Sequence, residues 1–337
     1  MRKKQNGITI LSAFILMLLL IIYSKQAAEG AFAGIELCLR TVIPSLFPFF
    51  VVSAWINPIL LSIRIPLLQG ISHILGIPQG CEGLLLMGLI GGYPVGAQAI
   101  AEYYQRGCLS KEHALRLLGF CNNAGPAFIF GIGGNLFPNL WIVWIVWAIH
   151  VLSAIITGFL LPYSITTQLR MQSSNASKTF TQALKQGINA TVTVCAWIIL
   201  FRALGNIFKP LAAQFPVLEI LSGFLELSGG CCNLIQVNEL FARYILYCVY
   251  LGFGGMCVLM QTVSVTQSMG VGLYPIGKIM QTAISFIMAW ITAQLIFTRQ
   301  QAVTPFIVIM LILSVLILFV CRKYSKIKYR NFLVNSV

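Results

Sequence analysis

The sequence predicts an all-α polytopic membrane protein, because apolar runs of membrane-crossing length recur throughout the 337-residue chain. Hydrophobic residues make up 58% of the chain and charged residues only 9%, whereas soluble domains carry roughly 25% charged residues. The mean hydropathy is +0.88. A chain with so few charges cannot cover a water-facing surface.

The apolar runs predict eight transmembrane helices, each about long enough to cross a hydrocarbon core of roughly 30 Å. Two further apolar segments, near 83–104 and 217–242, are interrupted at mid-length. We expect both to be re-entrant helical hairpins that enter and leave the membrane on one side. The expected spans are 8–23, 33–57, 115–137, 140–162, 187–207, 245–268, 277–298 and 302–320.

The first run follows Arg2, Lys3 and Lys4, and the small residues after it resemble a signal-peptide cleavage site. Cleavage is one alternative. A retained anchor is favoured, because the rest of the chain is itself membrane protein.

The positive charges predict the topology. Sixteen of the 22 Lys and Arg residues fall on segments assigned to the cytoplasm, Lys278 among them, and four fall outside. By the positive-inside rule, both termini of this multi-pass chain are then cytoplasmic in a bacterial plasma membrane. The net charge of +14 is therefore interpreted as topology, and no nucleic-acid partner is expected.

A polar stretch near 164–186 divides two halves that run through similar segments in opposite orientation. "GGYPVGAQ" at 91–98 aligns with "GGCCNLIQ" at 229–236, and "LGF" occurs at 118–120 and 251–253. Inverted repeats with broken helices are typical of secondary transporters, although matches this short also arise by chance. The expected divisions are an anchor (1–30), a first repeat (31–165), a linker (166–186), a second repeat (187–300) and a C-terminal helix with a basic tail (301–337).

The first broken segment predicts a solute site. Pro94 lacks a backbone donor and breaks the helix, so the helix N-terminus that follows it can face an anion. Gly92 permits a turn, while Tyr93 and Gln98 supply side-chain hydrogen bonds. The alternative is a proline kink packed against its neighbours.

The motif "FCNNAGPAFIFG" places two amides inside an apolar span. Asn122 and Asn123 are followed by Gly125 and Pro126, which unwind the helix. Polar groups within a membrane often mark a substrate path, so ligand contact is favoured over the alternative of interhelical hydrogen bonding.

The second half offers the matching polar groups. Ser228 and Gly229 mark the expected break, and Glu226 is either a coupling-ion site or the partner of Arg202 or Arg243. If the halves are pseudo-symmetric, then Gly254, Gln261 and Ser264 lie across from the two asparagines.

Enzymatic chemistry has little support. The chain has no aspartate, its three histidines are isolated, and it lacks the HExxH, GxSxG and P-loop patterns. The ten cysteines form no CxxC pair and lie mostly in apolar runs. We therefore expect neither a catalytic residue nor a cofactor nor a metal, and the expected partners are a small-molecule solute and the lipid bilayer.

The strings "GGYPVGA", "FCNNAGPAFIFG", "FLELSGG" and "LGFGGMCVLMQ" together resemble the sporulation integral membrane proteins of spore-forming Firmicutes. Those proteins carry nucleoside-recognition, or Gate, domains and are distantly similar to concentrative nucleoside transporters. The resemblance covers roughly 30–298. It implies a transporter-like core with two re-entrant hairpins, a homo-oligomer, and movement of dipicolinic acid across the outer forespore membrane.

This chain departs from that pattern in two ways. The family usually has a Lys a few residues after the proline, where this chain has Gln98, and the chain is short for the family. A nucleoside-like solute, and a non-transporting assembly protein of the spore, therefore stay open as alternatives.

Overall fold

A computed structural model describes residues 2–60, 63, 65–162, 178–212 and 214–297, and within these residues the chain is helical with no strand. Five helical stretches are long and apolar enough to cross a membrane. The all-α membrane class is thus confirmed. The expected span 302–320 and the basic tail lie outside the described residues.

Short helices fill the middle of each half, and the long helices α9 and α10 lie where the two halves join. In chain order they are α1 (Arg2–Ile22), α2 (Ser24–Leu37), the π-helical η1 (Cys38–Val42), α3 (Ile43–Leu60), α4 (Pro66–Ile74), α5 (Gly83–Ile90), α6 (Val95–Gln105), α7 (Lys111–Leu118), α8 (Pro126–Leu136), α9 (Leu140–Leu160), α10 (Phe180–Ile207), α11 (Lys209–Ala212), α12 (Pro216–Leu225), α13 (Leu227–Asn233), the 3₁₀ turn η2 (Leu234–Gln236), α14 (Leu240–Phe253), α15 (Gly255–Thr266), the 3₁₀ turn η3 (Gln267–Met269) and α16 (Tyr274–Phe297).

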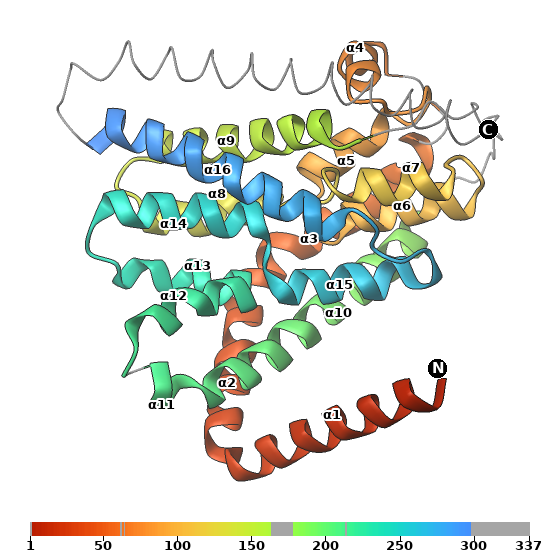
Figure 1. The fold of residues 1–337 in the computed structure, drawn as a ribbon. Helices are drawn as coiled ribbons and strands as arrows, with labels where there is room; N and C mark the ends of the chain where they lie inside the picture. The colour runs from red at the N-terminus through yellow and green to blue at the C-terminus, as the bar shows by residue number, and fades with distance from the viewer. Residues whose placement is uncertain (1, 61–62, 64, 163–177, 213, 298–337) are drawn as a thin grey trace, which may run out of the picture.

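Two helix groups frame the molecule. The helices α9, α14 and α16 pack on one another along one side, and α2, α3 and α10 pack together on the other (Figure 1). The short helices α5, α6, α8, α12, α13 and α15 lie between these groups. The interrupted segments therefore face protein on both sides, which is where freed backbone groups can find partners.

Close helix packing in the second group depends on glycine. A Cβ at Gly34 would lie 2.9 Å from the Cα of Ile199, and a Cβ at Gly30 would lie 2.9 Å from the Cα of Ala203. Small residues at these positions let the backbones of α2 and α10 approach, as is usual for helices in membranes.

The expected single span 115–137 is wrong. The structure has two helices there, α7 and α8, separated by non-helical residues 119–125. Pro126 occupies the first turn of α8 and Gly125 precedes it in an extended conformation, because proline suits a helix start but disfavours helical geometry in the residue before it. Likewise the expected span 245–268 is broken at Gly254, whose φ is +81°.

The polar turn before α7 ends in a side-chain cap. The hydroxyl of Ser110 accepts a hydrogen bond from the backbone N–H of His113 at 3.2 Å, which is an N-cap. Burial and the nearby Arg116 lower the pKa of His113.

Candidate functional site

The first helix break joins α5 to α6. Residues 91–94 leave the helix, Gly92 has a φ of +79°, and the Tyr93–Pro94 peptide bond is cis. This break packs on the non-helical residues 119–125, since a Cβ at Gly125 would lie 3.0 Å from the Cα of Gly92. The two interrupted segments of the first half thus share one contact.

The second helix break joins α12 to α13 and lies at Glu226, so the expected break at Ser228 and Gly229 is wrong. Both residues are in the first turn of α13, whose N-cap is Glu226 in an extended conformation. The carboxylate accepts hydrogen bonds from Ser228 N at 2.7 Å and from Gly229 N at 2.6 Å. An acidic side chain that satisfies two free N–H groups fixes the helix start at the next residue.

The second half repeats the contact found in the first. A Cβ at Gly255 would lie 3.3 Å from Leu227 N, so the break at Glu226 packs on the break between α14 and α15. The two halves meet where Tyr93 approaches Gly254, since a Cβ at Gly254 would lie 2.8 Å from the Tyr93 Oη.

Asn122 links the halves. Its side chain is fully buried; the Oδ1 accepts a hydrogen bond from Ala97 N at 3.2 Å, and the Nδ2 donates to Thr262 Oγ1 at 3.0 Å. The first bond satisfies an N–H in the opening turn of α6, and the second reaches α15. Both the oxygen and the nitrogen of the Asn122 side-chain amide are therefore hydrogen-bonded within the protein.

Asn123 is hydrogen-bonded to Lys278, which lies elsewhere than the sequence predicts. Its Oδ1 accepts a hydrogen bond from the Lys278 Nζ at 2.9 Å. Lys278, counted among the cytoplasmic charges, instead lies in α16 with 2% of its surface exposed. Lys278 lies one turn after Tyr274, on the face of α16 that also bears the buried Gln281, and its side chain is therefore in the interior.

A helical periodicity in the sequence could have found this lysine. The buried polar residues of α16 recur at the spacing of one helix face, which in an apolar helix indicates an interior polar stripe rather than a loop. They are Tyr274, Lys278, Gln281 and Ser285.

Eight of the fourteen predicted site residues line one or more of three separate spaces, while the side chains of Asn122 and Asn123 line none of them. The smallest, the central cavity, measures about 30 Å³, room for no more than a few water molecules. Both halves contribute to it: Tyr93 and Gly125 from the first, and Glu226, Ser228 and Gln261 from the second.

A polar pocket of about 410 Å³ opens beside the first break, within the range of small-molecule sites. We call it the Lys185 pocket. The predicted residues Pro94, Gln98 and Ser264 belong to this pocket and not to the central cavity. Its lining is Pro94, Gln98, Gln182, Lys185, Gln186, Asn189, Ala190, Thr193, Ser264 and Val265.

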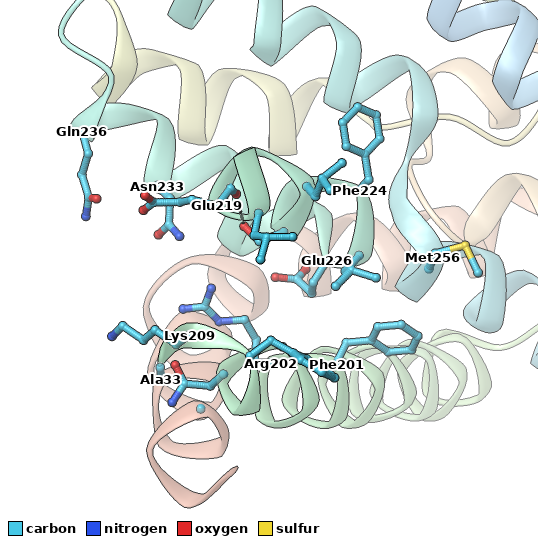
Figure 2. Close-up of a pocket in the computed structure, with 18 of the residues that line it drawn as sticks. Ala33, Phe201, Arg202, Lys209, Glu219, Phe224, Glu226, Asn233, Gln236 and Met256 are labelled. Atoms are coloured by element: carbon cyan, nitrogen blue, oxygen red, sulfur yellow. Dashed lines mark hydrogen bonds between the residues drawn. The ribbon is translucent and has the colours of Figure 1, made fainter. Parts of the chain in front are cut away.

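A third space of about 720 Å³, the Arg202 pocket, opens beside the second break. Figure 2 shows Arg202 on α10 and Glu226 at the α12–α13 junction facing it from opposite walls. No ion pair joins these two side chains among the described residues, while Arg243 donates to the carbonyls of Leu136, Ile235 and Val237. Glu226 also borders the central cavity and so lies between the two spaces.

The three spaces follow one another along single helices. From its N-terminus, α10 contributes Lys185 to the Lys185 pocket, Val194 and Ile198 to the central cavity, and Arg202 to the Arg202 pocket. The helix α15 visits them in reverse, with Met256 in the Arg202 pocket, Gln261 in the central cavity and Ser264 in the Lys185 pocket. The central cavity therefore lies between the two larger pockets along both helices.

Two predicted residues shape the site through the backbone alone. Gly92 and Pro126 set the turn at the first break and the start of α8, and neither lines any of the three spaces. Within the described part of the chain, no three His, Cys, Asp or Glu side chains are grouped so as to hold a metal ion.

No family profile matches this chain, and no solved structure matches it. The chain is 24% identical over 263 residues to the sporulation integral membrane protein YlbJ of Bacillus subtilis (strain 168). The match covers 69% of this chain and 63% of that relative, so the chain spans less than two thirds of its length. This similarity supports the sporulation membrane protein family and agrees with the five membrane-length helical stretches.

Proposed function

We propose that this protein is a secondary transporter that moves a small polar or anionic solute across the membrane by alternating access. The observation that carries the proposal is the succession of three spaces along α10 and, in reverse, along α15. The helix α10 has 28 residues, and at a rise of about 1.5 Å per residue it is about 42 Å long. That length exceeds a hydrocarbon core of roughly 30 Å.

The chemistry of the route fits a carrier closed in the middle. Both outer pockets are large enough for a small solute. The Lys185 pocket has a largely polar lining, and the Arg202 pocket sets Arg202, Glu219 and Glu226 in a mainly apolar one. The central cavity has apolar Val194 and Ile198 on its α10 wall. A solute reaches the centre only if the broken segments move, first away from one pocket and then from the other. Such gating of one repeat against another is how alternating access works.

The topology proposed for this carrier has two re-entrant hairpins in an inverted repeat. The matched contacts of Gly92 with Gly125 and of Leu227 with Gly255 support a common plan for the two halves. In the full arrangement eight segments cross the membrane, two of them as the broken pairs α7–α8 and α14–α15, with the repeat boundaries given above, cytoplasmic termini and a homo-oligomeric assembly. In it, the Lys185 pocket faces the cytoplasm, because basic residues gather beside it and basic residues mark the cytoplasmic side. Lys178 donates a hydrogen bond to Gln186 of that pocket, and Lys178 and Arg106 both pair with Glu102.

The proposed solute follows from the basic residues of the two outer pockets and from the similarity to YlbJ. Lys185 and Arg202 each place a cation beside one outer pocket, and guanidinium and ammonium groups are the usual partners of carboxylates. Since YlbJ is a sporulation protein, and the family resemblance implies dipicolinic acid, dipicolinate is the first solute to test. A nucleoside-like solute is the next.

A second candidate function is a non-transporting membrane protein for spore assembly. Two observations favour it: the central cavity is only about 30 Å³, and both side-chain amides of Asn122 and Asn123 are hydrogen-bonded within the protein. In that case the helix breaks serve packing alone.

Thiol labelling with a charged, membrane-impermeant reagent separates the two functions. On α10, Thr193→Cys lines the Lys185 pocket and the adjacent Val192→Cys, 62% exposed on the outer face, is the matched control. On α15, Met256→Cys lines the Arg202 pocket and Val263→Cys is the control. Each variant is labelled in right-side-out and in inverted vesicles, and the labelling of the wild type, which has the native cysteines alone, is subtracted as background.

The transporter proposal expects Thr193→Cys and Met256→Cys to label from opposite sides of the membrane and both controls to stay unlabelled. Labelling of both from the same side, or of neither, would overturn it. Dipicolinate uptake into proteoliposomes, and its loss in Asn122→Ala, then tests the solute.

A further inference from the structure

Lys278 is a buried basic side chain that the transport proposal does not use. Its ammonium donates three hydrogen bonds, to Tyr93 Oη at 3.0 Å, to Asn123 Oδ1 at 2.9 Å and to Gln281 Oε1 at 2.8 Å. An ammonium has three donors, so each has one oxygen partner. The rings of Tyr93 and Tyr274 lie 5.1 and 5.6 Å from the nitrogen, within cation–π range.

Backbone carbonyls orient the side-chain amides of Asn123 and Gln281. The Nδ2 of Asn123 donates to the carbonyls of Gly88 at 3.1 Å and Phe120 at 2.6 Å, and the Nε2 of Gln281 donates to the His150 carbonyl at 3.4 Å. Each amide therefore turns its nitrogen to a carbonyl and its oxygen to the ammonium. The three oxygens converge on one point because other elements of the fold orient them.

All three acceptors are neutral. The ion pairs found in the described part of the chain join Arg40 to Glu36, and Arg106 and Lys178 to Glu102, and none includes Lys278. The Lys278 nitrogen thus lies among three neutral oxygens, one hydroxyl and two amide carbonyls, and oxygen atoms of this kind can also act as cation ligands.

We propose that Tyr93, Asn123 and Gln281 form a monovalent-cation site, and that the Lys278 ammonium occupies it as a covalently attached cation. The chain thereby supplies a charge that would otherwise come from solution. Tyr93 accepts a hydrogen bond from Lys278 and also borders the central cavity, so Lys278 orients a side chain of that cavity. Lys278 is thus a positioning residue for Tyr93.

This inference holds whether or not the protein transports a solute, because it concerns cation binding alone. The Lys278→Ala variant removes the ammonium and leaves a space bounded by three oxygens, which a small cation can enter. Purified Lys278→Ala protein is melted in ammonium, methylammonium, sodium and choline chlorides at equal ionic strength. Choline is the reference, because its trimethylated nitrogen cannot donate a hydrogen bond.

In choline we expect Lys278→Ala to melt about 5 °C or more below the wild type, because three buried oxygens lose their donor. Ammonium or methylammonium should restore at least half of that shift, saturably, while the wild type melts alike in all four salts. Lys278→Met is the matched control: methionine fills the space without a charge, so its melting temperature stays low in every salt.

Equal melting of Lys278→Ala in ammonium and choline would overturn the proposal. If Lys278→Ala yields no folded protein in any salt, Lys278→Met decides: a Lys278→Met protein as stable as the wild type would show that the oxygens need no cation, which also overturns it. A lowered melting temperature for Lys278→Met supports the site.

Discussion

Gly254 is the point at which the two halves meet, and its replacement by alanine tests that contact. The residue ends α14 in a left-handed conformation with a φ of +81°, which glycine adopts freely and L-residues do not. It also has no room for a side chain, because an added Cβ would lie 2.8 Å from the Tyr93 Oη.

Two costs add in the Gly254→Ala variant. Placing alanine in the left-handed region costs about 1–2 kcal/mol. Moving the Tyr93 hydroxyl away weakens its hydrogen bond from the Lys278 ammonium, and a bond with a charged partner is worth about 1.5–3 kcal/mol. The expected destabilisation is therefore about 2.5–5 kcal/mol.

The assay is the apparent melting temperature of the purified protein in detergent, compared with Gly205→Ala. Gly205 lies within α10, has an ordinary φ, and an added Cβ there meets no atom within 4 Å. Alanine in a helix interior is favoured over glycine by about 0.5–1 kcal/mol, so the control should melt at or slightly above the wild type. If Gly254→Ala proves as stable as Gly205→Ala, the contact between the halves is not as described.

Two further substitutions test single residues of the site and its frame. Arg243→Gln removes guanidinium bonds to the carbonyls of Leu136, Ile235 and Val237 and should cost about 2–4 kcal/mol. Lys111→Gln, at an exposed position in the first turn of α7, should leave the melting temperature unchanged, and equal effects would contradict this. Glu226→Ala removes both bonds that cap α13 and should cost about 1–2 kcal/mol, while Glu226→Gln, which keeps one acceptor oxygen, should fall between it and the wild type; a Glu226→Ala protein that melts with the wild type would rule out the cap.

The local signals in the sequence located most of the breaks. Proline and glycine act on the backbone of their own neighbourhood, so the interruptions at Pro94 and at Gly125–Pro126 could be read without knowing what surrounds them. The second break lies at Glu226, two residues before the predicted Ser228, because the acidic side chain caps the helix that follows it. Predicting that cap required knowing that Glu226 turns back onto Ser228 and Gly229 rather than toward an arginine.

The sequence by itself determined the class of this protein, because nine charged residues in every hundred cannot cover a water-facing surface and repeated apolar runs of about 20 residues indicate membrane-crossing helices. It also determined which segments break, because those signals are local. Only the tertiary structure decided where the polar groups go. Lys278 is a lysine near a helix start in the sequence, and it is an interior cation because Tyr93 and Asn123, 185 and 155 residues away, supply its oxygens. Partners so distant along the chain are brought together by packing and leave no periodicity of their own.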